Sequence, residues 1–229
     1  MLGERTGHIL EAAIREFIRT GEPISSGELW STHDFGIRPA SIRHELHELT
    51  EQGYLEQPYH SAGRVPSDKG YEFFAARVIR GSSHIPSFAK QCESFFRDAR
   101  WEDLLHELSL GLGVLGVVED ERDGEVYKEG LDDLVERLSW DSPAEIKEII
   151  RDFEEIDERL NALSAFLEED VVRVFVGKRS PITKSKHLSV IAAEYGEGEG
   201  RVVLAAIGPK RMDYQKVIGV FKGLKSNAS

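Results

Sequence analysis

Apolar side chains in the N-terminal part of the chain recur at the three- and four-residue spacing of an amphipathic helix. This pattern runs through residues 4–20 and predicts a helix that Gly21 ends. Ser25 and Ser26 are preferred N-cap residues and predict a short second helix, which stops at a turn over residues 33–36. The chain is therefore expected to begin with two helices separated by a tight break.

A third helix is predicted from Pro39, a residue favoured in the first helical turn, to a stop at Gly53. Its core stripe is predicted to be Ile42, Leu46 and Leu49. The opposite face carries hydrogen-bond donors near its N-terminal end, where a docked helix meets base edges, whereas Glu48 and Glu51 lie toward the other end. The donors are Arg38, Arg43, His44 and His47, and Ser41 lies on one flank of this face. Because DNA repels carboxylates, this polarity suits an approach by the helix N-terminus.

The pattern changes to short extended segments after the third helix. Residues 54–57 and 64–66 predict two strands around a polar, mildly basic turn at 58–63. A further helix from Ser67 is predicted to pack through Tyr71, Phe73, Phe74, Val78 and Ile79. Three helices followed by a two-stranded ribbon are the element order of a winged helix-turn-helix, in which the third helix enters the major groove and the ribbon touches the flanking backbone. Winged helices also serve as protein-interaction modules, and the element order alone leaves that alternative open.

Two motifs in the middle of the chain resemble cofactor or metal sites, but their context argues against both. Residues 111–116 match G-x-G-x-x-G, yet they follow a helix predicted over residues 101–110 and lead into Val117-Val118 instead of opening a helix. The acidic residues 120–125 lack the alternating ligand spacing of an EF-hand and predict a solvated hairpin or loop. We expect no cofactor and no metal ion.

A long apolar stripe follows these motifs. Ser142-Pro143-Ala144-Glu145 is a capping box with Pro at the first helical position. The helix that it opens is expected to keep one apolar face for more than 20 residues, from Ile146 to Leu167. Such a face packs along its own domain or against a second copy of the chain, and both options stay open.

The C-terminal part is predicted to form a sheet. Residues 171–177, 187–195 and 201–207 predict strands, and the Gly-rich residues 196–200 join the last two. Asp213 is expected to cap a final helix with Tyr214, Val217, Ile218, Phe221 and Leu224 facing inward. The predicted fold class is α+β, with an N-terminal winged helix-turn-helix and a C-terminal α/β domain in which helices cover antiparallel strands.

The net charge of the chain excludes one class of DNA-binding protein. The chain of 229 residues has a formal net charge of −12, which excludes a highly basic nucleic-acid-packing protein and requires any DNA contact to come from a local basic patch. Residues 119–170 hold 20 acidic and 6 basic side chains and are interpreted as an acidic helical spacer.

No targeting or membrane segment is predicted. The longest apolar stretch, residues 108–118, is far shorter than the ~20 residues that span a bilayer. Regularly spaced charges in residues 1–20 exclude a secretory signal, and the single Cys92 cannot form an internal disulfide. We expect a cytoplasmic protein without a membrane partner.

Three N-terminal segments carry a specific pattern: Thr20-Gly21-Glu22-Pro23-Ile24-Ser25-Ser26, Ser41-Ile42-Arg43-His44-Glu45-Leu46, and the run from Gly53-Tyr54-Leu55 to Lys69-Gly70-Tyr71. They resemble the DNA-binding domain of the HrcA-type heat-inducible transcription repressors, although relatives typically carry Asn where this chain has His44. Val174-Phe175-Val176-Gly177 and the run from Ile207-Gly208-Pro209 to Asp213-Tyr214 are similar to the close of the GAF-like regulatory domain of the same repressors.

The element order and the resemblance together predict three parts. Residues 1–80 are expected to form a winged-helix DNA-binding domain, residues 81–100 a linker or connecting helix, and residues 101–229 a GAF-like regulatory and dimerisation domain. The resemblance implies repression of heat-shock and chaperone genes, with a chaperonin as a possible partner that keeps the repressor folded. Relatives are longer between Val118 and Leu131, where they carry an inserted dimerisation domain, so their dimer contacts do not transfer to this chain.

We therefore expect a sequence-specific DNA-binding repressor. A single winged helix buries too little surface for tight binding, so a homodimer on an inverted-repeat operator is expected. Arg43 and His44 are expected to contact base edges, with support from Ser41 and His47. The side chains expected to bind phosphate are Arg38, His60, Arg64 and Lys69.

Two other functions remain open from the sequence. The same DNA-binding module can belong to a small-molecule-sensing regulator, and the net charge of −3 in residues 1–80 favours an interaction module without DNA binding. An enzyme is not expected, because no Ser/His/Asp or Cys/His set stands at a recognisable spacing and Cys92 lies in a predicted amphipathic helix, which is typical of a buried structural thiol.

Overall fold

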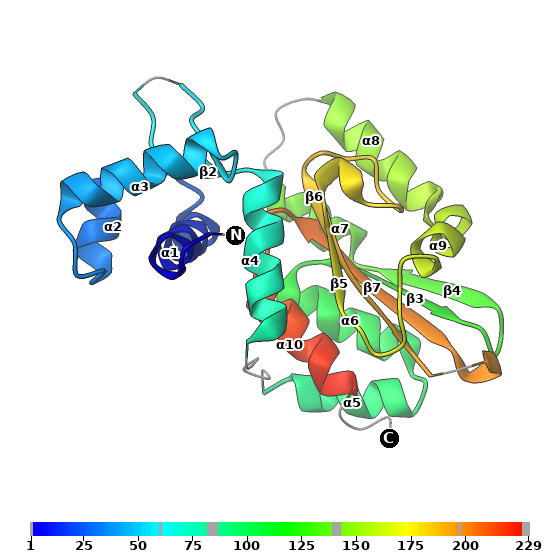
Figure 1. Cartoon of the computed structure of the whole chain (residues 1–229). Coiled ribbons are helices and arrows are strands. Elements are labelled where there is room, and N and C mark those ends of the chain that lie inside the picture. The colour runs from blue at the N-terminus through cyan, green and yellow to red at the C-terminus, as the bar shows by residue number, and fades with distance from the viewer. Residues whose placement is uncertain (1, 60, 82–86, 139–142, 197, 226–229) are drawn as a thin grey trace. The chain divides into compact units, whose positions relative to one another are not determined.

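The computed structural model describes residues 2–59, 61–81, 87–138, 143–196 and 198–225 (Figure 1). The chain divides into two compact units, Met1–Arg77 and Val78–Ser229. The predicted α+β class is confirmed, since helices pack with antiparallel sheets in the described residues.

Three helices open the first unit, and their ends follow the local signals in the sequence. The helices are α1 (Glu4–Thr20), α2 (Ser26–Thr32) and α3 (Pro39–Glu51). Gly21 ends α1 in the left-handed conformation at φ 74°, which glycine adopts without a steric cost. At the start of α2, Ser25 and Glu28 form a capping box: the Ser25 hydroxyl accepts from the Glu28 N–H, and the Glu28 carboxylate accepts from the Ser25 N–H. These three predicted helices are confirmed.

A short ribbon and the larger part of a fourth helix complete this unit. Strand β1 (Leu55–Glu56) pairs antiparallel with β2 (Val65–Pro66), and α4 (Asp68–Arg80) follows. Ile24, just before α2, exchanges two backbone hydrogen bonds of 2.8 and 2.9 Å with Arg64 and so ties the base of the ribbon to the helices. A side chain at Gly63 would place its Cβ 2.6 Å from the Ile24 carbonyl oxygen, so this close approach requires glycine.

The second unit is built on one five-stranded antiparallel sheet. In the order of the sheet its strands are β4 (Glu125–Glu129), β3 (Leu115–Asp120), β7 (Val202–Pro209), β6 (Leu188–Tyr195) and β5 (Arg173–Val176). Its helices are α5 (Ala89–Arg97), α6 (Trp101–Leu112), α7 (Leu131–Arg137), α8 (Pro143–Glu154), α9 (Ile156–Ser164) and α10 (Tyr214–Lys225). The strands predicted near the C-terminus and the final helix are confirmed, with shorter bounds at β5.

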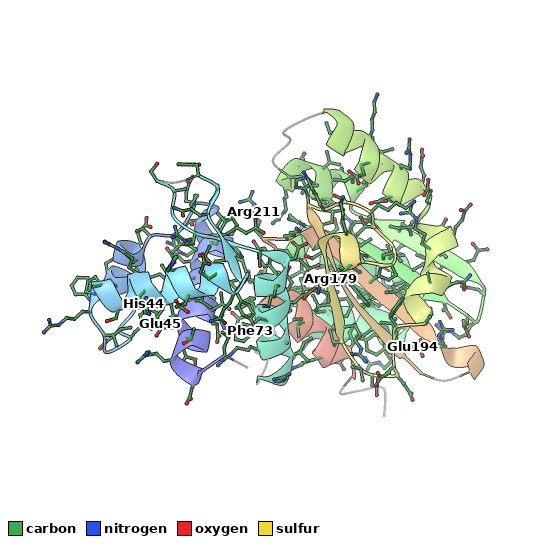
Figure 2. All side chains as sticks on the ribbon, turned by 45° about the horizontal axis from the view of Figure 1, so that its top comes forward. His44, Glu45, Phe73, Arg179, Glu194 and Arg211 are labelled. Carbon is green, nitrogen blue, oxygen red and sulfur yellow. The ribbon has the colours of Figure 1, made fainter. Side chains whose placement is uncertain are left out.

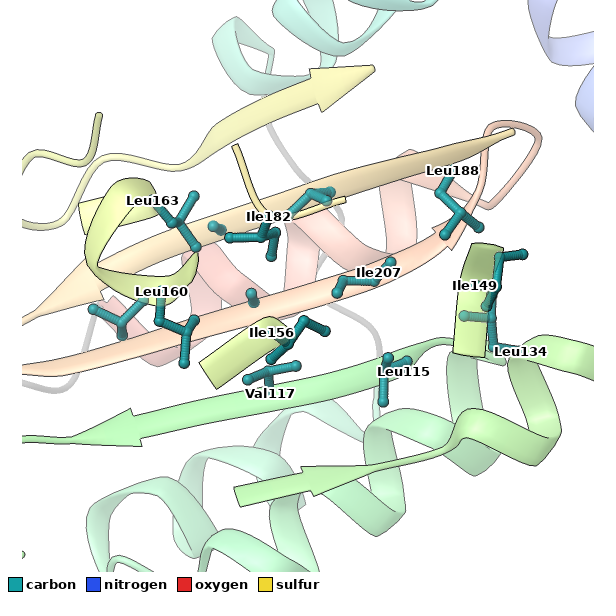
Figure 3. Close-up of a cluster of buried hydrophobic side chains, with 14 residues drawn as sticks. Leu115, Val117, Leu134, Ile149, Ile156, Leu160, Leu163, Ile182, Leu188 and Ile207 are labelled. Carbon is teal, nitrogen blue, oxygen red and sulfur yellow. The ribbon is translucent and has the colours of Figure 1, made fainter. Parts of the chain in front are cut away.

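One face of this sheet meets α7, α8 and α9 in a continuous hydrophobic cluster (Figure 3). Alternate residues of the central strands point to this face, which is the period-two pattern of a half-covered sheet. The helices contribute Leu134, Ile149, Ile156, Leu160 and Leu163, all of them buried. The other face meets α6 and α10, where the Ser189 and Tyr214 hydroxyls lie 2.8 Å apart and the Tyr195 hydroxyl donates to the Phe221 carbonyl oxygen.

The interpretation of residues 119–170 as a spacer is wrong. Asp120 and Asp152 of this segment are buried, and its apolar side chains form much of the cluster over the sheet, so this acidic segment is part of the second unit's core. The expected single long helix is also wrong, since α8 ends at Glu154 and α9 begins at Ile156. Ser142 of the predicted capping box lies outside the described residues.

A buried carboxylate near this break holds the loop that precedes β6. Asp152 accepts backbone hydrogen bonds from Lys184 at 2.9 Å and Ser185 at 3.2 Å, and the Thr183 hydroxyl also donates to it. Arg159 of α9 pairs with the same carboxylate, Nη1 to Oδ1, at 2.7 Å. Asp152 thus joins α8, α9 and residues 183–185 at one point.

The G-x-G-x-x-G match at residues 111–116 spans the end of α6 and the start of β3 and opens no helix, as its sequence context predicts. The acidic residues 120–125 form the β3–β4 hairpin turn. None of the helices in the described part of the chain combines the length and the apolar character needed to cross a bilayer.

Candidate nucleic-acid interface

Helix α3 separates its apolar and polar residues as the sequence predicts. Ile42, Leu46 and Leu49 are buried, whereas the predicted donors are exposed. These exposed donors are Arg38, Ser41, Arg43, His44 and His47. Within the described residues, the side chains of Arg38, Arg43 and His47 make no hydrogen bond or ion pair, so they are available to a partner.

The start of α2, the exposed side of α3 and the ribbon enclose a hollow of about 220 Å³. Arg43 of α3 and Arg64 of the ribbon both line it, together with the Ser25, Ser26 and Ser61 residues. Two guanidinium groups with nearby hydroxyls form an arrangement that suits an anionic oxygen-rich ligand such as a phosphate. The structure therefore brings two of the sequence-predicted residues, distant in the chain, to one surface.

Arg64 also has an internal role that the sequence does not reveal. Its Nε donates to the Thr50 hydroxyl on α3 at 3.1 Å, and its Nη1 donates to the Ala62 carbonyl oxygen at 3.3 Å. Because its backbone also pairs with Ile24, Arg64 holds the ribbon against the helices. Only part of its guanidinium group is left to contact a ligand.

Lys69 lies in the first turn of α4, and its side chain reaches the C-terminal end of α3. Its Nζ donates to the Gln52 carbonyl oxygen at 2.8 Å and lies 4.1 Å from the centroid of the Tyr54 ring. This contact stabilises the free carbonyls at the end of α3 and leaves the exposed Lys69 side chain beside the ribbon. His60, the remaining predicted contact, lies outside the described residues.

Glu45 is a functional position that the helical pattern misses. It directly follows His44 on α3, but its carboxylate is buried toward α1 (Figure 2). Arg5 donates to it through Nη2 at 2.7 Å and Thr6 through its hydroxyl at 2.8 Å. Burial raises the pKa of Glu45, but the hydrogen bonds from Thr6 and Arg5 outweigh burial and bring the pKa below its ordinary value. Glu45 therefore stays ionised and fixes the position of α3 on α1.

A family model matches most of the second unit. Residues 89–218 match the model described as "HrcA protein C terminal domain", which is more than half of the chain. The chain belongs to the HrcA family. The resemblance seen in the sequence is thereby confirmed.

Curated HrcA relatives match parts of the chain. The "Heat-inducible transcription repressor HrcA" of Carboxydothermus hydrogenoformans is 39% identical over 108 residues, which are 47% of this chain and 30% of the relative. The protein of the same name from Bifidobacterium animalis subsp. lactis is 44% identical over 94 residues, which are 41% of this chain and 25% of the relative. The matched stretches thus span less than a third of the length of either relative.

A solved structure shares the fold of this HrcA-family chain. It is described as "Crystal structure of a hypothetical protein at 2.2 A resolution", and it aligns with 100% of this chain and 98% of its own, with a TM-score of 0.83. The two sequences are 15% identical, so this likeness concerns the fold alone.

Proposed function

We propose that this HrcA-family chain is a sequence-specific transcription repressor whose first unit binds double-stranded DNA as a winged helix-turn-helix. Helix α3 would enter the major groove, with Arg43 and His44 at base edges and Ser41 and His47 beside them. The ribbon between β1 and β2 would act as the wing. The observation that carries this proposal is the row of exposed, unpaired donors on α3 next to the hollow that Arg43 and Arg64 share.

Local charge supports the orientation of this contact. Arg38 directly precedes α3 and Arg43 lies in its N-terminal half, whereas Glu48 and Glu51 are exposed toward its C-terminal end. A DNA duplex attracts the first end and repels the second, which favours insertion by the N-terminal half. Arg38, Lys69 and His60 would contact phosphate.

The size of the first unit favours two copies on one operator. A single module of this kind buries about 600–1,000 Å² of protein surface on DNA, which is little for tight specific binding at physiological salt. A homodimer would place two α3 helices in successive major grooves of an inverted repeat, about 34–36 Å apart. Such a complex would occlude a promoter and repress transcription.

The second unit would then act as a GAF-like regulatory and dimerisation domain. The name shared by its relatives, heat-inducible transcription repressor, supports heat-shock and chaperone genes as the targets and loss of repression on heating. A domain with a stability of about 5–15 kcal/mol can lose much of its active population through a change of a few kcal/mol, and a chaperonin would counter that loss.

The salt dependence of binding to a labelled random duplex tests this proposal. The logarithm of the binding constant should fall linearly with the logarithm of salt concentration, with a slope of about −0.9 for each phosphate contacted. Arg38→Gln should make the slope shallower by about 1, whereas Arg19→Gln, at the end of α1, should not change it. Failure to bind any duplex at low salt would instead support an interaction module without DNA binding.

A further inference from the structure

The second unit contains a pocket of about 190 Å³ that the proposed DNA contact does not use. It lies where the ends of several elements meet: the C-terminal half of α5, the start of α6, the β3–β4 turn, the β6–β7 loop and the end of α10. Figure 1 shows α5 next to α10 at this end of the unit. The pocket is therefore formed by segments that are far apart in the sequence.

Three aromatic rings form the apolar wall of the pocket. Phe96 stands edge-on to Trp101, with centroids 5.5 Å apart, and edge-on to Tyr195, with centroids 4.9 Å apart. The Trp101 indole N–H donates to Asp120 and the Tyr195 hydroxyl to the Phe221 carbonyl oxygen, each at 2.9 Å. Because their polar atoms are occupied, Trp101 and Tyr195 can offer an incoming group chiefly ring surface, which favours a flat apolar ligand.

Next to these rings, Arg122 and Asp120 form a salt bridge in which the two charges neutralise each other. Arg122 donates to Asp120 through Nε at 2.8 Å and Nη2 at 2.6 Å, and its guanidinium carbon lies 5.6 Å from the centroid of the Trp101 ring. Hydrogen bonding from Arg122 lowers the pKa of the buried Asp120, so this carboxylate is ionised. Within the described residues, Nη1 of Arg122 makes no further hydrogen bond and remains available at the pocket.

Two opposite charges at the pocket have at most one weak partner. Glu93 and Arg97 lie one turn apart on α5, and both line the pocket. Among the described residues, Glu93 has no ion pair or hydrogen bond, and Arg97 only reaches Asp98 at 4.0 Å, the limit of an ion pair. A ligand that carries one positive and one negative group would satisfy both side chains, whereas an anion alone would face Glu93 and a cation alone would face two arginines.

We propose that this pocket binds a small zwitterion with a flat apolar ring, of the class of an aromatic α-amino acid. The ring would lie against Phe96, Trp101 and Tyr195, the ammonium group would pair with Glu93, and the carboxylate would pair with Arg97 and Nη1 of Arg122. The pocket is smaller than the ~300–1,000 Å³ of sites for drug-sized ligands, which restricts the ligand to about a dozen non-hydrogen atoms. This site would make the second unit a sensor of such a molecule, whether or not the first unit binds DNA.

The test is a titration of the full chain with L-phenylalanine, followed by the ¹H–¹⁵N resonance of the Trp101 indole. The chain has three tryptophans, so Trp30→Phe and Trp140→Phe variants assign this resonance. We expect a saturable shift. Phenethylamine lacks the carboxylate, 3-phenylpropionate lacks the ammonium group, and L-alanine lacks the ring, so each should bind about tenfold more weakly or worse.

Substitutions in the pocket lining distinguish the contribution of its charges to ligand binding from that of its shape. Glu93→Gln should weaken phenylalanine binding about tenfold and remove the preference for phenylalanine over 3-phenylpropionate, while Arg97→Gln should remove the preference over phenethylamine. Glu102→Gln, an exposed residue of α6 outside the pocket lining, is the matched control and should bind normally. Gly200 lines the pocket and a Cβ there meets no atom within 4 Å, so Gly200→Leu should fill the pocket without disturbing the fold and abolish the shift.

Three results would overturn the proposal. They are the absence of a saturable Trp101 shift with L-phenylalanine, equal affinity for phenylalanine and its two charge-deleted analogues, and normal binding by Gly200→Leu. Backbone amide spectra that superpose away from the pocket would show that the variants are folded, so a negative result counts against the site. Because none of these measurements uses DNA, their outcome is separate from that of the repressor proposal.

Discussion

The Thr6 hydroxyl on α1 donates a hydrogen bond of 2.8 Å to the Glu45 carboxylate on α3. This contact crosses the first unit and fixes the helix that we propose inserts into DNA. Glu45 is buried and the preceding His44 is exposed, so the same turn of α3 carries both an anchor on its inner side and a donor on its outer side. The stability of the unit and the position of the donor face are therefore linked through one side chain.

Glu45→Ala should lower the free energy of unfolding of the first unit by about 1–3 kcal/mol, because the Thr6 hydroxyl loses its acceptor and the contact between α1 and α3 is lost. Urea unfolding of the full chain, followed by probes in each unit, measures this change. Glu48→Ala is the matched control: Glu48 is exposed on the same helix, and its removal should change stability by no more than about 0.5 kcal/mol. Equal effects of the two substitutions would show that Glu45 is not an anchor.

The same carboxylate predicts a loss of stability in acid. The folded-state pKa of Glu45 lies below its ordinary value of 4.5, so its ionised form stabilises the fold above that value, and this contribution is lost as the pH falls through the lower, folded-state pKa. The difference in unfolding free energy between the native chain and Glu45→Gln should therefore shrink on acidification through this range. A difference that stays constant would contradict the ionised anchor.

Arg43 and Arg64 are expected to affect DNA binding in different ways. Arg43→Ala should cost about 1–3 kcal/mol on the operator and relax sequence preference, because a lost base contact is specific to sequence. Arg64→Ala should weaken binding to operator and random duplex alike, since Arg64 holds the ribbon through Thr50 and Ala62. Fluorescence anisotropy on both duplexes measures the two effects, with Arg19→Ala as a control for lost charge. Equal loss on the two duplexes for Arg43→Ala would contradict its role at base edges.

Replacement of Asp152 is expected to lower the stability of the second unit. Asp152→Ala should lower the free energy of unfolding by about 1–3 kcal/mol, because it removes one of the two carboxylates that pair with the largely buried Arg159 and takes away the acceptor of the Lys184 and Ser185 N–H groups. Chemical denaturation of the full chain measures the loss. Glu154→Ala, an exposed residue of the same helix, should be close to neutral. A similar result for both would mean that the Asp152 contacts contribute little.

The contact between His106 and Glu129 on the surface of the second unit predicts a raised pKa for His106. His106 Nδ1 of α6 lies 2.6 Å from Glu129 Oε1 of β4, and this hydrogen bond raises the pKa of His106 above its ordinary value of 6.5. The pair therefore stabilises the fold below that value and loses its effect as the pH rises through the higher, folded-state pKa. An NMR titration should give a midpoint above 6.5 in the native chain and a lower one in Glu129→Gln. An unchanged midpoint would show that Glu129 is not the cause.

The first unit could be predicted closely because its signals are local. Gly21, the Ser25 capping box, Pro39 and Gly53 each mark a helix boundary through the conformation of a few neighbouring residues. The exposed side of α3 follows from the same helical period. The inner side of α3 could not be predicted in the same way. A glutamate is expected on an exposed polar face, and only the contacts of Glu45 with Arg5 and Thr6 explain its burial.

The second unit was harder to predict because its decisive contacts are tertiary. Acidic residues surround Leu134, Ile149 and Ile156, so the segment resembles a solvated spacer until the sheet that these side chains cover is known. The break at Glu155 also leaves the apolar period intact, which is why one long helix was expected. The pocket beside Trp101 has no sequence motif, since it forms from the ends of five elements.

The most direct measurement of the central claim is the selection of bound fragments from a pool of random duplex DNA by the full chain. If α3 recognises DNA, the recovered fragments should share two inverted half-sites about one helical turn apart, and Arg43→Ala should recover a weaker or altered half-site from the same pool. Recovered fragments with no shared sequence, or the same fragments recovered equally well by Arg43→Ala, would contradict the assignment of α3 as the helix that recognises DNA.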